Sequence, residues 1–207
     1  MEVVVFEKKL NNAELGKGNV HDCYIREDSD FDFKDFRFVT SESMNFWCSR
    51  NSKMYEGIHY EKFPNESRIA GLGDFFRDFS ITAADSIIIT GHFSDKKRDY
   101  SIDVQKNENI IVISKSKNGL EILNPEKLDL LNGEVLYNGQ IIKLEFLLKA
   151  KKRADAPSLT DFYALTLDGL PFDLSKVGKM FEIKVEDTQA IIKDRRNWKK
   201  SNFEIGD

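Results

Sequence analysis

A tetrapeptide at the end of the first third of the chain, Asn65-Glu66-Ser67-Arg68, has side chains that can read the edge of a base. Arginine donates through a forked guanidinium and asparagine both donates and accepts, so each can form two hydrogen bonds to one base in the major groove. The glutamate can accept from the amino group of cytosine, or it can hold Arg68 in one rotamer. From these four residues alone, an exposed loop with an ordinary surface ion pair is the commoner explanation.

The local elements predict that this tetrapeptide stands where a loop enters a strand. Pro64 prevents a preceding helix from continuing, and residues 67–70 read as a short strand. A helix over residues 73–79 follows, because Phe75, Phe76 and Phe79 form an apolar stripe after a glycine. Asn65, Glu66 and Arg68 are therefore expected at a junction between a loop and a strand.

Most of the chain alternates short strand-forming runs with turn residues, which is typical of an all-β protein. We expect strands at residues 3–6, 23–26, 36–39, 45–48, 86–90, 100–104 and 110–114. In the second half, Asn138-Gly139 and Asp168-Gly169 predict tight hairpin turns, and Phe181, Ile183 and Val185 alternate with charges along a late strand. Asn124-Pro125 predicts the cap and first turn of a helix over residues 126–131.

This pattern predicts a mainly β fold with a few short helices, forming a closed or half-closed barrel. With 207 residues and 41% hydrophobic side chains, a single domain over residues 1–207 is the better expectation. No apolar run approaches the length of a membrane helix and the first ten residues lack the pattern of a signal peptide, so we expect a cytoplasmic protein with no membrane partner. Cys23 and Cys48 lie far apart and are expected to be buried thiols.

Charge restricts how the protein could bind nucleic acid. The formal net charge is -4, so binding through unspecific charge alone is not expected and a local basic patch is required. One basic cluster comprises Lys149, Lys151, Lys152 and Arg153, which could contact phosphates weakly. A second comprises Lys193, Arg195, Arg196, Lys199 and Lys200, whereas residues 27–35 are strongly acidic. Such runs are usually solvated surface, but phosphate contacts would position a duplex without reading it.

The common catalytic signatures are absent, and no cofactor or metal is expected. Glu182-Ile183-Lys184 matches the Glu-x-Lys fragment of metal-dependent nucleases, but such a fragment arises by chance on many charged strands and no aspartate partner is evident. Two other classes of function stay open on the residues alone. The chain could be a compact nuclease with Glu182 and Lys184 at its metal site, or a protein-interaction barrel with no nucleic-acid role.

Two separated stretches resemble one family. Residues 8–25, KKLNNAELGKGNVHDCYI, are similar to the opening of the effector-binding domain of the type II restriction endonuclease EcoRII and its relatives, where a glycine-containing loop leads into a strand. Residues 47–50, followed by Asn65 to Ile69, resemble that family's aromatic strand ending in Ser-Arg and its Asn-Glu-x-Arg-Ile element. The order and spacing of the two stretches agree with the family. Residues beyond Gly119 show little family likeness.

The resemblance implies a B3-like DNA-binding pseudobarrel with two arms that enter the major groove and recognise a short sequence. Carried over by position, the first arm would comprise Lys17, Gly18, Asn19 and His21, and the second Arg50, Lys62, Asn65, Glu66, Ser67 and Arg68. The first arm is shorter than in the family, so either Asn19 or His21 takes the place of the usual histidine. We favour Asn19, because it follows Gly18 directly.

The resemblance also implies the partner, which is double-stranded DNA. In the family the pseudobarrel is a recognition or effector domain attached to a nuclease, and 207 residues leave no room for a full catalytic domain as well. The chain itself is therefore expected to lack catalytic activity. It would be either an excised domain of a larger enzyme or a free-standing recognition protein, with a nuclease domain or subunit as its companion.

Overall fold

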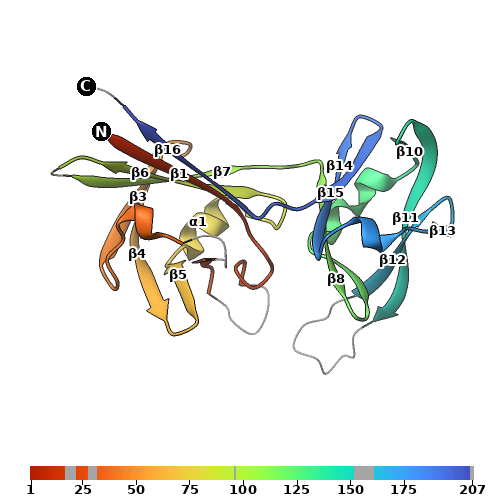
Figure 1. Ribbon diagram of the computed structural model, residues 1–207, viewed down its shortest axis with the longest axis horizontal. Helices are drawn as coiled ribbons and strands as arrows, with labels where there is room; N and C mark the ends of the chain where they lie inside the picture. Colours follow the sequence, from red (N-terminus) through yellow and green to blue (C-terminus); the bar gives the residue numbers. More distant parts are fainter. Residues whose placement is uncertain (17–21, 28–31, 96, 152–160, 206–207) are drawn as a thin grey trace. The chain divides into compact units, whose positions relative to one another are not determined.

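The computed structural model describes residues 1–16, 22–27, 32–95, 97–151 and 161–205, and it is mainly β, as predicted (Figure 1). Strands account for 56% of the residues and helices for 10%, so the helices are minor elements. We expected a single domain, but the chain divides into two compact units: unit 1 comprises Met1–Lys106 and Arg196–Asp207, and unit 2 comprises Asn107–Arg195. Unit 2 is thus inserted in the sequence between the strands of unit 1.

Unit 1 is one curled sheet with the strand order β16-β1-β6-β7-β3-β4-β5-β2. Its strands are β1 (Glu2–Lys9), β2 (Ile25–Arg26), β3 (Ser43–Cys48), β4 (Lys53–Phe63), β5 (Glu66–Ala70), β6 (Ser86–Phe93), β7 (Arg98–Gln105) and β16 (Trp198–Glu204), with helix α1 (Gly73–Asp78) and the 3-10 turn η1 (Lys34–Phe36). All neighbours are antiparallel except β3 and β7, which run parallel. The first and last parts of the sequence meet in this sheet, because β1 pairs with β16.

The concave interior of unit 1 is filled by aromatic rings, and this overturns one predicted strand. Residues 36–39 form no strand: Phe36 ends η1, and Arg37 then adopts a left-handed conformation with a φ of 54°. Phe36 and Phe38 stack on each other with their centroids 5.3 Å apart, and Phe38 also contacts Tyr100 at 5.1 Å. An aromatic-rich run with strand propensity is therefore used as a plug, because its rings fill the sheet's interior.

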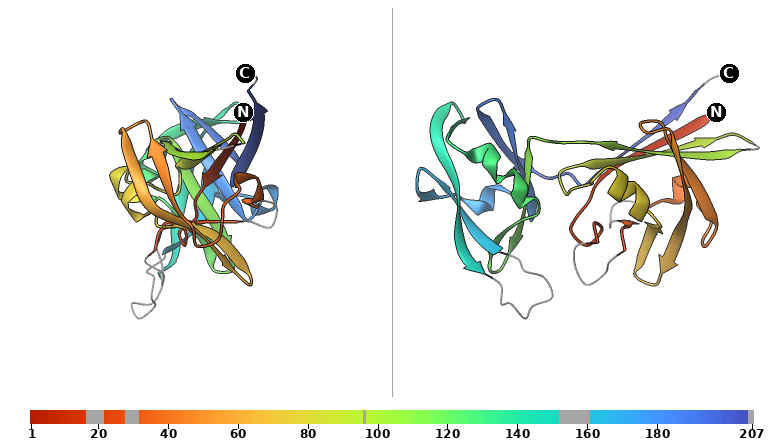
Figure 2. Two further views of the ribbon diagram at one scale, coloured as in Figure 1. Left: turned by 90° about the vertical axis from the view of Figure 1, so that its left-hand side faces the viewer. Right: turned by 180° about the vertical axis from the view of Figure 1, so that it is seen from behind.

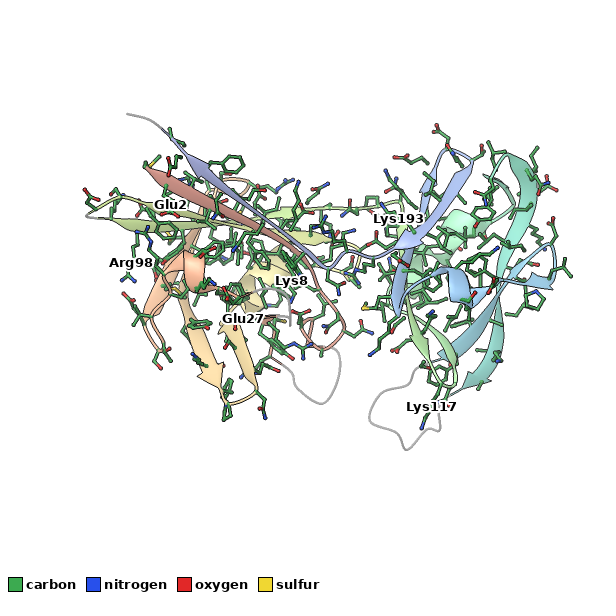
Figure 3. The ribbon with its side chains drawn as sticks, in the orientation of Figure 1. Glu2, Lys8, Glu27, Arg98, Lys117 and Lys193 are labelled. Atoms are coloured by element: carbon green, nitrogen blue, oxygen red, sulfur yellow. The ribbon has the colours of Figure 1, made fainter. Side chains whose placement is uncertain are left out.

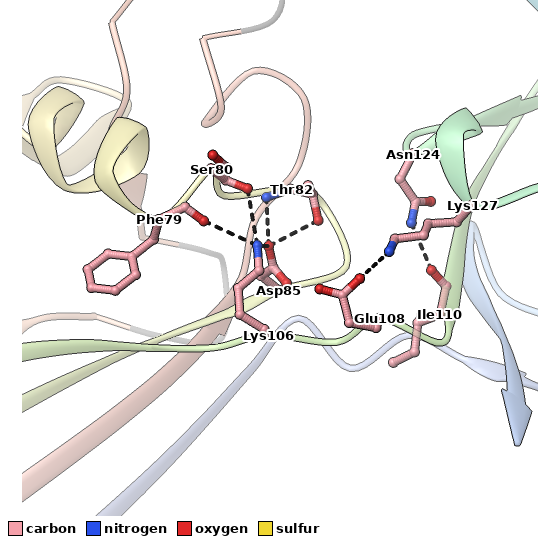
Figure 4. Close-up of polar contacts among 9 residues, drawn as sticks. All are labelled: Phe79, Ser80, Thr82, Asp85, Lys106, Glu108, Ile110, Asn124 and Lys127. Carbon is pink, nitrogen blue, oxygen red and sulfur yellow. Dashed lines mark hydrogen bonds and ion pairs between the residues drawn. The ribbon is translucent and has the colours of Figure 1, made fainter. Parts of the chain in front are cut away.

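Helix α1 was predicted and is confirmed (Figure 2), and its Phe75 and Phe76 are buried. Phe75 contacts Tyr55 of β4 edge to face, at a centroid distance of 5.2 Å. Behind the helix, Lys106 donates to the carbonyl oxygens of Phe79 and Ser80 and to Oδ2 of Asp85, at 2.6 Å (Figure 4). The segment between α1 and β6 is thereby tied to the end of β7.

Unit 2 is a closed barrel of seven strands, in the order β11-β10-β15-β14-β8-β9-β12, with β11 pairing back to β12. Its strands are β8 (Ile110–Ser116), β9 (Gly119–Ile122), β10 (Glu134–Tyr137), β11 (Gln140–Lys151), β12 (Asp161–Leu167), β14 (Met180–Glu186) and β15 (Gln189–Asp194), with β13 (Leu170–Pro171) added to β12 and the 3-10 turns η2 (Pro125–Leu131) and η3 (Leu174–Lys176). The second half of the chain therefore closes on itself.

The turn chemistry of unit 2 follows the sequence closely. Asn138 and Gly139 both have positive φ, 49° and 81°, in the two-residue turn between β10 and β11. Asp168 and Gly169 do the same between β12 and β13. Both predicted hairpins are confirmed, since asparagine, aspartate and glycine tolerate this backbone conformation better than other residues.

Asn124 differs from its prediction. It makes no side-chain cap for η2, and its fully buried amide instead bridges two backbone groups of β8. Oδ1 accepts from the N–H of Val112 at 2.8 Å. Nδ2 donates to the carbonyl of Ile110 at 2.7 Å, and Figure 4 shows this second bond. The residue therefore replaces a missing strand neighbour inside the barrel.

Two smaller expectations have mixed outcomes. Cys48 is buried as predicted, whereas Cys23 is only partly buried, and both thiols are free. Burial still raises the pKa of the Cys23 thiol. Within the described part of the chain, no helix has the length and apolar character needed to cross a membrane.

Candidate nucleic-acid interface

The tetrapeptide Asn65-Glu66-Ser67-Arg68 spans the turn and the start of β5 in the β4–β5 hairpin, so the predicted entry of a loop into a strand is present, whereas the long strand β4 before it was not predicted. Glu66 is the first residue of β5, and Glu61 of β4 is the register partner of Arg68. Because side chains alternate along a strand, Glu61, Phe63, Glu66 and Arg68 share one face of the hairpin, which we call the Arg68 face. On the opposite face of the hairpin, Ile69 is fully buried.

Proline and glycine bound the hairpin. Pro64 and Asn65 form its two-residue turn, where the missing N–H of proline is not needed for pairing. β5 ends at Ala70, because Gly71 follows with a φ of +85°. A side chain at Gly71 would place Cβ only 2.7 Å from the carbonyl oxygen of Gly57, so the two strands approach closely there.

Arg68 is held in one conformation by three neighbours. Its Nε donates to Oε2 of Glu61 at 2.6 Å, and its guanidinium lies between two rings, 4.9 Å from the centroid of Phe63 and 5.0 Å from that of Tyr24. Only 21% of the side chain is exposed. A guanidinium fixed in this way has lost most of its rotamer freedom before any ligand arrives.

Glu61 orients Arg68, and the sequence reasoning missed it by assigning that role to Glu66. The hydrogen bond from Arg68 lowers the pKa of the Glu61 carboxyl, and that from His59 lowers it further. His59 Nε2 lies 3.0 Å from Glu61 Oε1, while Nδ1 lies 3.1 Å from the carbonyl of Gly57. The hairpin register would have revealed Glu61, because a two-residue turn at Pro64-Asn65 pairs residue 61 with residue 68.

Glu66 has a looser place on the same face. Its carboxylate lies 3.9 Å from Arg68 NH1 and 3.7 Å from Arg26 NH1, both longer than hydrogen bonds. It therefore adds negative charge between two arginines without fixing either of them. Of the two roles considered for Glu66, the structure gives the orienting role to Glu61 and leaves the base-contact role open.

A buried ion pair holds the segment that leads into the first arm. Glu14 and Lys8 are almost fully buried, with Nζ 2.8 Å from Oε1 (Figure 3 labels Lys8). The Glu14 carboxylate also accepts from the backbone N–H groups of Asn11 and Arg26, both at 3.0 Å, and its carbonyl accepts from the N–H of Tyr24 at 3.1 Å. Glu14 thus fixes both ends of the segment between residues 15 and 23.

The same contacts bring the end of that segment to the Arg68 face. Ile25 and Arg26 of β2 pair with Ile69 and Arg68 of β5, and Tyr24 stacks on Arg68. The first-arm residues themselves, Lys17, Gly18, Asn19 and His21, lie outside the described residues.

The remaining second-arm residues do not all lie together in the structure. Asn65 is exposed at the hairpin tip, whereas Lys62 and Ser67 are register partners on the other face and Ser67 is buried. Arg50 lies in the turn between β3 and β4, where its Nε donates to Asp103 of β7 at 2.8 Å. The compact part of the predicted arm is therefore Asn65, Glu66 and Arg68.

The basic clusters do not form a simple patch. Lys149 is exposed on β11 of unit 2, while the side chain of Lys151 and all of Lys152 and Arg153 lie outside the described set. In the second cluster, Arg195 is buried 3.6 Å from Glu182, and Lys200 pairs with Asp35. Part of the positive charge of the second cluster is therefore neutralised by ion pairs within the protein.

The Glu-x-Lys fragment also has a structural explanation. Glu182 is buried beside Arg195, and Lys184 pairs with Glu186. Over the ranges the structure describes, no group of three or more histidine, cysteine, aspartate or glutamate side chains is arranged to hold a metal ion. Nothing in the described residues favours the nuclease alternative.

Comparison of the chain with protein-family models, with curated proteins and with solved structures found no match.

Proposed function

We propose that unit 1 is a B3-like pseudobarrel that binds double-stranded DNA in a sequence-specific way, as the recognition or effector domain of a restriction endonuclease. One observation carries the proposal: the two stretches that resemble that family are brought together, with β2 paired to β5 and Tyr24 stacked on Arg68. Residues more than forty positions apart, such as Tyr24 and Arg68, thus meet at one polar surface. The resemblance is accordingly assigned to unit 1, and not to the whole chain.

The Arg68 face has suitable chemistry for reading a base edge. Since Nε is already bonded to Glu61, the two terminal nitrogens of Arg68 are the donors available to O6 and N7 of guanine. Asn65, exposed beside it, can bond an adenine in the same way. Pre-ordered donors reduce the entropy cost of binding, which favours selective contacts over unspecific ones.

The test begins by selecting bound duplexes from a random pool and then measuring affinity for the selected target by fluorescence anisotropy. Arg68→Ala is expected to weaken target binding by about 1–3 kcal/mol and to relax the preference at one base position. The matched control is Arg98→Ala. Arg98 is also an ion-paired arginine of unit 1, bonded to Glu42, but it lies at the opposite end of the unit from Lys8 (Figure 3).

The control variant is expected to bind like the parent, because Arg98 bonds Glu42 and the carbonyl of Arg37, which do not belong to the Arg68 face. If Arg68→Ala binds target and random duplexes as the parent does, the proposed reading role is wrong. If the parent shows no salt-sensitive binding to any duplex, DNA binding itself is wrong, and an interaction barrel becomes the better explanation.

A further inference from the structure

Phe63 is an exposed aromatic ring at the tip of the Arg68 face. It is the last residue of β4, next to the exposed turn of Pro64 and Asn65, and 46% of its surface is accessible. A large apolar side chain at a hairpin tip gives up favourable burial, so its position calls for an explanation. One face of the ring contacts the guanidinium of Arg68, which lies 4.9 Å from the ring centroid.

These contacts form a stack in which Arg68 lies between Tyr24 and Phe63. Glu61 fixes the guanidinium at the centre, so Phe63 rests against a group that cannot move freely. Tyr24 closes one end of the stack, since it is buried, whereas Phe63 ends it at the solvent. Phe63, the more exposed of the two rings, is therefore the one that a further planar group could reach.

We propose that Phe63 stacks against an unpaired nucleobase of the bound DNA. This inference rests on the proposed DNA-binding function and names the base contact that the arginine alone does not supply. Every base has a π face that stacks on aromatic side chains, and the exposed Asn65 and Glu66 beside the ring offer hydrogen-bonding groups. The same chemistry applies to a base turned out of a duplex and to a base in a single strand.

The experiment compares a perfect duplex of the selected target with duplexes that carry one unpaired base, placed in turn at each position. A base that is already unpaired does not have to be extruded, so its contact with Phe63 is obtained at lower cost. The parent is expected to bind the best bulged duplex about tenfold more tightly than the perfect one, within the range of single base–aromatic stacking.

Three variants assign the preference to the ring. Phe63→Ala and Phe63→Leu are both expected to reduce the tenfold ratio to about one, since leucine is apolar but cannot stack, and Phe63→Trp is expected to keep it. Phe203→Ala is the matched control: Phe203 is 53% exposed on the edge strand β16 of the same unit, and its loss should leave the ratio unchanged. Thermal unfolding of each variant shows that the fold is retained.

A single strand of the target sequence identifies the source of the base. Binding that depends on Phe63 in the bulged duplex alone supports a base turned out of a duplex, and equal dependence in the single strand supports a base that is already free. If the perfect duplex is bound with the expected Arg68 dependence but Phe63→Ala changes no ratio, the stacking proposal falls and the proposed function stands. If no DNA is bound, both fall.

Discussion

Unit 1 and unit 2 differ in the edges of their sheets: the sheet of unit 1 is open and that of unit 2 is closed. Unit 2 pairs β11 with β12 and so leaves its barrel closed, with an apolar interior that includes Ile111, Phe181 and Ile183. The sheet of unit 1 stays open, with the two-residue β2 at one edge and the lysine-containing β16 at the other, which are both devices that discourage unwanted pairing. A closed barrel has no free strand edge, whereas an open sheet has two edges at which additional segments can be placed.

Each unit also contains a buried ion pair, and the two pairs have different surroundings. Glu14 in unit 1 bonds Lys8 and two backbone N–H groups that belong to the ends of the first-arm segment. Glu182 of β14 lies 3.6 Å from Arg195, which directly follows β15. We infer that the first pair connects stability to the candidate interface, whereas both residues of the second pair belong to unit 2.

The largest expected effect comes from breaking the pair in unit 1. Glu14→Ala removes the carboxylate that pairs with the buried Lys8, which should lower the free energy of unfolding by about 3–5 kcal/mol. Both tryptophans of the chain, Trp47 and Trp198, belong to unit 1, so tryptophan fluorescence during urea unfolding reports on that unit. Affinity for the selected DNA should fall in the same variant, because the end of the arm segment is released.

Glu182→Ala provides the comparison within unit 2. It should shift the unfolding transition seen by far-ultraviolet circular dichroism while changing the tryptophan transition and DNA affinity little. Glu42→Ala, which removes an exposed partner of Arg98, is the surface control and should cost about 1 kcal/mol or less. Equal shifts of both signals in both buried variants would mean that the two units unfold as one, and the distinction drawn above would be wrong.

An intermediate effect is expected at Asn124, whose buried amide bridges two backbone groups of unit 2. Asn124→Ala leaves the N–H of Val112 and the carbonyl of Ile110 without this partner inside the barrel, and should cost about 2 kcal/mol. Circular dichroism during urea unfolding measures it. Asn132→Ala is the control, since Asn132 is exposed and its side chain donates to Asp129 at the surface. Equal stability of the two variants would show that the amide bridge is unimportant.

The smallest expected effect concerns pH and the Arg68 face. Because the bond from Arg68 lowers the pKa of Glu61 from its ordinary 4.5, the ionised carboxylate stabilises the folded state above that pH, and this contribution is lost as the pH falls through the lowered pKa. Glu61→Gln should therefore be less stable than the parent at pH 7, by about 1 kcal/mol or less for this partly exposed pair. Urea unfolding of both proteins between pH 7 and about pH 3 measures the difference. A difference that stays constant over that range would exclude the proposed ionisation.

The sequence predicted the elements whose causes are local. Asn138-Gly139 and Asp168-Gly169 determine their turns through backbone conformation, and the stripe of Phe75, Phe76 and Phe79 determines a helix by its spacing. The expected strand at residues 36–39 failed because propensity carries no information on what its rings will pack against. The predicted capping role of Asn124 was wrong for the same reason, since the backbone groups that its side chain bonds belong to β8.

For the candidate interface, the sequence by itself identified Asn65, Glu66 and Arg68 and placed them where a loop enters a strand. Only the tertiary structure decided that Glu61 orients Arg68, that Phe63 and Tyr24 enclose it, and that Glu14 holds the neighbouring segment. Residue type is a property of one position, whereas each of these contacts joins segments that come together only in the folded chain. Spacing along the sequence therefore selects the chemistry, and strand register selects its partners.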